Sequence, residues 1–190
     1  RALKRFNAQF QSRKIGKYYL AVVESDMEVG QPCHWEDFVR KIPDAARAEI
    51  VPEGHEGARH ARLEATVLAT AEGLSLLGID LATGRMHQIR VQAATRGCPI
   101  VGDWVYGARR RLIAEQMGAS TTARERSMRI ALHALRLEFH HPQTARGMAA
   151  TAPVPAHWIT LPERIRAVAQ HNAEESARRV GRGWEWICGL

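Results

Sequence analysis

The sequence contains few cysteines and no long hydrophobic run, and both absences exclude classes of protein. Its three cysteines, Cys33, Cys98 and Cys188, are odd in number, far apart and outside any CxxC pair. They therefore predict neither a disulfide framework nor a zinc site. This cysteine usage fits a location in the reducing cytoplasm. No apolar run approaches the roughly 20 residues of a transmembrane helix, so we expect no membrane insertion.

Glycine-rich phosphate loops and internal repeats are also missing. The triplets GAR, GMA and GRG are isolated, and none follows a strand pattern as a nucleotide-binding loop does. No segment repeats, which excludes a solenoid. The strand patterns occur mainly in hairpins with few helices between them. The predicted fold class is therefore α+β, with a mixed, mostly antiparallel sheet and flanking helices.

The charge of the chain points toward an anionic partner. Lysine and arginine total 27 against 20 aspartates and glutamates, which gives a net charge of +7 at neutral pH. A basic surface attracts polyanions over long distances, so nucleic acid is the first candidate. Solvated arginines that bind nothing specific would give the same charge, so the charge alone does not separate these two interpretations.

Hydrophobic patterns assign the main elements along the chain. Residues 1–13 have the spacing of an amphipathic helix, and residues 18–24 are aromatic and β-branched, as in a buried strand. Residues 25–60 are punctuated by proline and glycine and predict loops or short edge strands. Further along we expect hairpins within residues 63–81 and 130–155, an exposed basic arm with helical potential over residues 107–129, and a surface helix and tail after residue 156.

The segment TGRMHQIRVQAATRG, residues 83–97, has the pattern of a short amphipathic helix. Thr83 is suited to the N-cap, and Gly97 to the left-handed position that follows a helix C-terminus. In this register Ile89 and Ala93 face the core.

Three cationic or titratable side chains lie close together in residues 83–97. Arg85 lies in the first predicted turn, while His87 and Arg90 are three residues apart and therefore adjacent on the helix surface. A helix start with cationic side chains suits phosphate binding, because charge and free backbone N–H groups act together. By itself, an arginine near the apolar face is either a surface residue or a half-buried cation that needs a carboxylate partner.

The longer stretch GRMHQIRVQAATRGCPIVGDWVYG, residues 84–107, resembles the GR-x-HQ-[IL]-R-x-H … G-x-P-[IL]-x-GD-x-x-YG signature of RluA-type RNA pseudouridine synthases. KYYLAVV, from Lys17, is similar to the family's K-x-Y-x-A-x-V strand. LHALRLEFHHPQT and ATAPVPAHW resemble its C-terminal motifs. The resemblance covers residues 3–158, far more than a chance short motif would.

The resemblance implies that uridine is isomerised to pseudouridine in structured RNA, ribosomal or transfer, without a cofactor or metal. RNA is then the partner, and no obligate protein partner is inferred. The target nucleotide is expected to be flipped out of its stack. The implied catalytic domain covers residues 1–165 and is incomplete at its N-terminus, and residues 166–190 form a C-terminal helix and tail.

Two residues match catalytic positions of the family. Tyr19 matches the tyrosine that stacks on the uracil and is a proposed proton acceptor, and Arg90 matches the arginine that pairs with the catalytic aspartate. Without the resemblance, Tyr19 would be interpreted as a core aromatic residue, with Tyr18 on the opposite face as the packing residue. The expected RNA contacts are Arg85, His87 and Gln88 at the helix start and Arg109, Arg110 and Arg111 in the basic arm, which would otherwise be a solvated charged loop.

The sequence also departs from the family pattern. Gln92 and Ala150 stand where the family usually has a histidine and an aromatic residue, and the H-R-L-D segment with the catalytic aspartate is absent. The aspartates that are present lie in other contexts, and Asp103, at the family's GD position, is expected to have a local structural role. We interpret Arg90 as a cation kept for a carboxylate that these residues do not supply.

Two explanations of the missing segment compete. In the first, the chain is part of a longer synthase and is inactive alone, which the opening RALKRF, without an initiator methionine or an N-cap, favours. In the second, it is a noncatalytic RNA-binding protein derived from a synthase. A third interpretation is a basic domain without a specific partner, which salt-dependent RNA binding would exclude.

Overall fold

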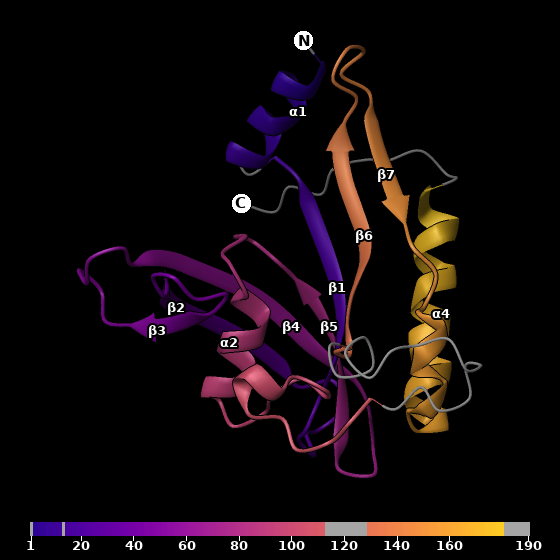
Figure 1. Cartoon of the computed structure of the whole chain (residues 1–190). Coiled ribbons are helices and arrows are strands. Elements are labelled where there is room, and N and C mark those ends of the chain that lie inside the picture. Colours follow the sequence, from indigo (N-terminus) through magenta and orange to yellow (C-terminus); the bar gives the residue numbers. More distant parts are fainter. Residues whose placement is uncertain (1, 13, 113–128, 181–190) are drawn as a thin grey trace, which may run out of the picture.

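The structure is a computed structural model that describes residues 2–12, 14–112 and 129–180 (Figure 1). Seven strands form one sheet in the order β3-β2-β4-β5-β1-β6-β7, and all of the described pairings are antiparallel. This confirms the α+β class. The strands are β1 (Gly16–Val23), β2 (Pro32–Lys41), β3 (Ala48–Val51), β4 (Arg59–Ala71), β5 (Leu74–Asp80), β6 (Leu132–His140) and β7 (Gly147–Thr151). The helices are α1 (Ala2–Gln11), α2 (Gln88–Thr95) and α4 (Glu163–Val180), with 3₁₀ turns η1 (Trp104–Tyr106) and η2 (Ala156–Thr160).

Most of the elements expected from the sequence are confirmed. β4 and β5 are joined by Glu72 and Gly73, which have φ values of +54° and +71°, as a tight hairpin turn requires. β6 and β7 form the second expected hairpin. The prediction for residues 25–60 is wrong in one respect, since β2 is ten residues long and lies inside the sheet between β3 and β4. The prolines and glycines that suggested loops lie at or beyond its ends.

The two faces of the sheet carry different helices. Val91 of α2 packs in one buried cluster with Ala61 of β4. Through the registers Ala65↔Ile79 and Tyr19↔Ile79, this face continues to Tyr19, because alternate residues of a strand share a face. The opposite face is covered by α4, which packs against β4, β5, β6 and β7. Tyr18 and Tyr19 therefore lie on opposite faces, as expected.

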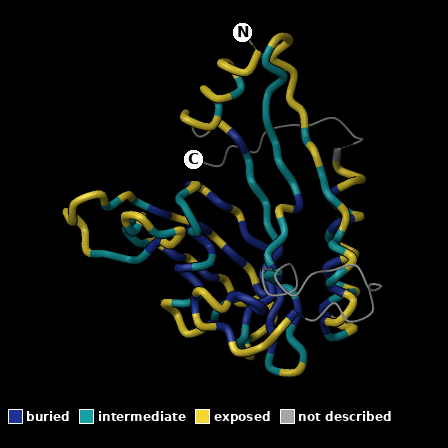
Figure 2. The backbone as a smooth tube through the Cα atoms, viewed as in Figure 1, coloured by how far each residue is buried: buried dark blue, intermediate teal, exposed yellow. Residues whose placement is uncertain are grey.

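In Figure 2 the upper part of β1 and β6 is only half-buried and β7 is largely exposed, in contrast to the more buried lower part of the sheet. α1 lies beside this upper part and has no buried residue. It is attached by Gln9, whose amide donates to the His140 carbonyl at 2.7 Å and accepts from the His140 N–H at 2.8 Å. The described part of the chain thus leaves the Tyr19 face of these strands open.

The lower part of the sheet forms one core together with α4. Ile165, Ala169 and Ala173 of α4 belong to the same buried cluster as Leu20 and Leu77 of the sheet. The expected boundary between residues 165 and 166 falls inside this helix. No helix in the described residues is both long and apolar enough to cross a membrane.

Candidate active site

Tyr19 lines a hollow of about 190 Å³ on the open face of β1, β6 and β7. Three small side chains, Ala134, Ala150 and Ala152, contribute to its walls. Lys17 joins the hollow to the segment that precedes α2, because its Nζ lies 3.3 Å from the position that a Cβ on Gly84 would occupy. The structure therefore places the hollow that Tyr19 lines beside the GRMHQ motif, with Lys17 between them.

Burial raises the pKa of the Tyr19 hydroxyl above its usual value of 10. At neutral pH the hydroxyl is therefore protonated, and the side chain offers an uncharged ring and an O–H group. Such a ring can stack on a base, whereas a phenolate acting as a base is disfavoured. Of the two roles that the resemblance implies for Tyr19, this environment favours stacking.

The start of α2 differs from the prediction. Thr83 is not the N-cap: the helix begins at Gln88, and His87 precedes it with a left-handed φ of +52°. His87 stands at the N-cap position and makes no side-chain capping hydrogen bond. The Gln88 carboxamide instead holds the loop before the helix, since its Oε1 accepts from the Arg85 N–H at 3.0 Å and from the Thr83 hydroxyl at 2.8 Å. Gln88 Nε2 donates to the Arg62 carbonyl at 3.1 Å. Gln88 is only 2% exposed, so its expected contact with RNA is corrected to a role in holding this loop.

Arg90 has a carboxylate partner within the chain. Its Nε and Nη2 donate to the two Asp103 oxygens at 2.6 and 2.7 Å, and the Arg90 side chain is 16% exposed while that of Asp103 is 1% exposed. The Arg90 guanidinium also stacks on the Tyr106 ring at 4.9 Å. The inference that Arg90 requires a carboxylate from a missing segment is therefore wrong. Asp103 fills that need and has the structural role expected of it.

His87 joins this pair to the edge of the sheet. Its Nε2 lies 2.9 Å from Arg90 Nη1, and since arginine only donates, Nε2 must be the accepting nitrogen. The proton is then on Nδ1, which donates to the Tyr106 hydroxyl oxygen at 3.1 Å. That oxygen also accepts from the Ala48 N–H of β3 at 2.8 Å, and the hydroxyl donates to the Ala48 carbonyl at 3.2 Å.

This network predicts an acid-sensitive fold. Burial and the Arg90 charge lower the pKa of His87, so the unfolded chain binds the proton more tightly than the folded chain. The stabilising contribution is therefore complete above the unfolded pKa of about 6.5 and is lost as the pH falls below it. Urea unfolding at several pH values should show stability decreasing over this range, and His87→Gln should reduce the slope. ¹⁵N chemical shifts of an Nε2–H tautomer at neutral pH would contradict the assignment.

The other arginines expected to contact RNA are Arg85 and Arg109–Arg111. Arg85 is half-buried, and its Nε donates to the His60 carbonyl at 2.9 Å. The exposed arm is anchored at its start by Glu24, whose carboxylate accepts from the backbone N–H groups of Arg109 and Arg110 at 2.6–3.0 Å. The expected continuation of the arm, residues 113–128, lies outside the described residues.

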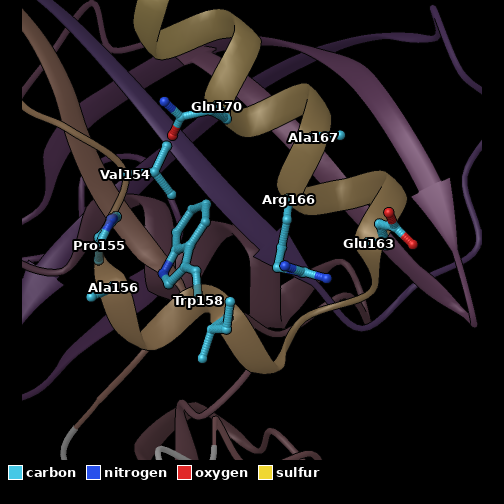
Figure 3. A pocket seen from close by; sticks show the side chains of 9 residues that line it. Val154, Pro155, Ala156, Trp158, Glu163, Arg166, Ala167 and Gln170 are labelled. Carbon is cyan, nitrogen blue, oxygen red and sulfur yellow. The ribbon is translucent and has the colours of Figure 1, made fainter. Parts of the chain in front are cut away.

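A second hollow, of about 400 Å³, lies between residues 154–159 and α4 (Figure 3). Trp158, Arg166 and Gln170 contribute to its lining. None of the site residues expected from the sequence lines it. The hollow at Tyr19 is therefore the candidate active site.

Comparison with known proteins identifies the family of the chain. A model of the family described as RNA pseudouridylate synthase matches residues 1–95, half of the chain. The chain belongs to this family. Its RluA-type resemblance is likewise confirmed. An uncharacterised RNA pseudouridine synthase of Chloroflexus aurantiacus is 36% identical over 159 residues, 82% of this chain and 44% of the relative. Ribosomal large subunit pseudouridine synthase D of Xylella fastidiosa is 35% identical over 176 residues, 93% of this chain and 50% of the relative.

Solved structures show the same fold. Human RNA pseudouridylate synthase domain containing 4 aligns with a TM-score of 0.59 at 20% identity, covering 84% of this chain and 66% of the human one. The second human protein of this type, domain containing 1, gives a TM-score of 0.58 at 21% identity, covering 87% and 70% of the two chains. The chain spans about half the length of the two bacterial relatives.

Sequence reasoning missed two contributors to the site. Lys17 lines the hollow, and Tyr106 connects His87 to β3. Both stand at named positions of the family signature, the K of K-x-Y and the Y of YG. These positions were the available signal, but the signature does not say which neighbours the side chains contact.

Proposed function

We propose that this protein acts in the isomerisation of uridine to pseudouridine in RNA. In that reaction the bond from ribose C1′ to uracil N1 breaks and a bond from C1′ to C5 forms. C5 loses a proton and N1 gains one, so the product is an isomer and no redox cofactor is required. The observation that carries the proposal is the hollow at Tyr19 beside the GRMHQ segment.

The hollow suits a flipped uracil. A planar base stacks on an aromatic ring, and the alanine walls leave space for it beside Tyr19. Arg85 and the Arg109–Arg111 arm provide positive charge for the phosphates around the flipped nucleotide. The 35% identical relative from Xylella fastidiosa is named as acting on the large ribosomal subunit, so ribosomal RNA is the first target to test, and transfer RNA the second.

We further propose that the catalytic carboxylate comes from polypeptide outside the 190 residues, so that this chain alone is inactive. Asp103 is buried against Arg90, and Asp37 is hydrogen-bonded to Gln92 and Arg96. Asp80 of β5 lies opposite Tyr18 in the strand register, so it is on the sheet face opposite Tyr19. None of the five aspartates is among the residues that line the hollow. The catalytic role that the resemblance implies for Arg90 remains a proposal, because its guanidinium is already paired with Asp103.

The two adjacent tyrosines allow a matched test in cells. Pseudouridines are mapped in ribosomal and transfer RNA from cells that lack the gene and from cells complemented with the natural gene carrying Tyr19→Ala or Tyr18→Phe. Loss of the stacking ring should weaken base binding roughly 5- to 100-fold and remove most of the modification at one site. Tyr18→Phe, on the α4 face, should leave it in place. An unchanged pseudouridine map in the deletion strain would contradict the enzymatic function.

The alternative function is noncatalytic RNA binding. It would be favoured if deletion leaves all pseudouridines unchanged while the purified protein binds RNA with an affinity that falls steeply as salt increases. Absence of RNA binding at low salt would exclude both functions.

A further inference from the structure

The 3₁₀ turn η1 exposes a tryptophan that the chemistry at Tyr19 does not use. Trp104 is 46% exposed, and its neighbour Val105 is 47% exposed. Among the exposed large apolar side chains of the described residues, Trp104 is the largest. An exposed indole on a rigid turn is a common feature of binding surfaces, because it offers a large contact area with little conformational freedom to lose.

The turn that carries Trp104 is held on both sides. Asp103 precedes it and is fixed by both hydrogen bonds from Arg90. Tyr106 follows it, is 8% exposed, and is hydrogen-bonded to both backbone groups of Ala48. The backbone reverses at Gly102 and Gly107, with φ values of +84° and +87°. The position of Trp104 is thus fixed by the same network that orders the start of α2.

A cation is already stacked on the indole. The guanidinium carbon of Arg111 lies 5.5 Å from the centroid of the Trp104 ring. The basic arm that carries Arg111 is anchored at its start, because the Glu24 carboxylate accepts from the backbone N–H groups of Arg109 and Arg110. Glu24 is therefore hydrogen-bonded to the backbone. We call Trp104 and Arg111 the Trp104 platform.

We propose that the Trp104 platform stacks an unpaired base of the RNA, distinct from the nucleotide at Tyr19. This inference rests on the proposed function. A planar indole with a guanidinium against it matches the way that proteins bind single-stranded RNA, where bases stack on aromatic and arginine planes and phosphates meet nearby cations. The side chains of Arg109 and Arg110 are exposed next to the platform, and the chain has a net charge of +7. This positive charge favours a polyanionic partner such as RNA.

The test separates base contacts from phosphate contacts. Two labelled probes are titrated at low salt: a single-stranded oligouridylate of roughly 12 nucleotides, and an abasic ribose-phosphate oligomer of the same length. Trp104→Ala should weaken binding of the oligouridylate roughly 5- to 100-fold and leave binding of the abasic oligomer unchanged. Trp104→Phe should retain most of the affinity. Arg111→Ala should weaken both probes and reduce the salt slope by about one.

Val105→Ala is the matched control, because it removes exposed apolar surface from the same turn without removing an aromatic ring, and it should change neither affinity. Circular dichroism and the melting temperature of each variant confirm folding. Equal binding of the oligouridylate by the wild-type protein and Trp104→Ala, or equal losses on both probes, would overturn the platform and leave the proposed function standing. Failure of the wild-type protein to bind either probe or ribosomal RNA at low salt would instead overturn the proposed function.

Discussion

Replacing Arg90 with methionine is expected to lower the free energy of unfolding by about 3–5 kcal/mol. The substitution leaves the Asp103 carboxylate, whose side chain is 1% exposed, buried without its cation. It also removes the donor to His87 Nε2 and the stacking contact with Tyr106. Urea unfolding at neutral pH measures this change, and the melting temperature should fall by roughly 10 °C in a domain of this size.

An exposed ion pair in the same chain provides the control. Arg179 and Glu175 of α4 have side chains that are 63% and 47% exposed, and Arg179→Met should cost far less stability than Arg90→Met, because solvent screens an exposed pair. The double variant Arg90→Met with Asp103→Leu should recover much of the stability lost in Arg90→Met, because no buried charge is left unpaired. If Arg90→Met and Arg179→Met lose similar stability, the Arg90–Asp103 pair contributes no more than a surface pair. Turnover of any Arg90 variant must therefore be compared per folded molecule.

Local patterns in the sequence were sufficient for most of the sheet. The pattern of apolar residues, the aromatic content and the turn residues are short-range properties of the sequence, and they locate β1 and the two hairpins. The left-handed Gly97 after α2, with φ +72°, was predictable for the same reason. The helix start was not, because the chain turns through a left-handed residue at His87, and Thr83 binds the Gln88 carboxamide instead of capping the helix. Sequence identifies residues able to cap a helix but does not show whether the preceding loop brings them to its first turn.

The candidate site was only partly predictable. The resemblance identified Tyr19 and the GRMHQ segment, and the structure brings their strands and loop together through Lys17 and Gly84. The partner of Arg90 was missed although Asp103 is only 13 residues away. The turn at Gly102, which brings this carboxylate back over α2, depends on contacts with residues near Arg129. Such long-range contacts leave no periodic signal.

Gly102→Ala is expected to destabilise the protein by about 3 kcal/mol or more. Gly102 has a φ of +84°, which is unfavourable for a residue with a Cβ, and that Cβ would overlap the backbone carbonyl oxygen of Arg129. A backbone group cannot move aside as a flexible side chain can. The same residue donates its N–H to the Arg110 carbonyl at 2.9 Å, so a shift of the turn also disturbs the root of the basic arm.

Gly107→Ala separates conformational strain from overlap in this experiment. Gly107 has nearly the same φ, +87°, but no atom lies within 4 Å of the position of its added Cβ, so the cost should be only about 1–2 kcal/mol. Displacing the Gly102 turn also moves Asp103 away from Arg90, and the losses of Gly102→Ala and Arg90→Met should therefore overlap. Their double variant should lose clearly less stability than the sum of the two single losses. Strict additivity in urea unfolding would show that the turn does not position the Asp103 carboxylate.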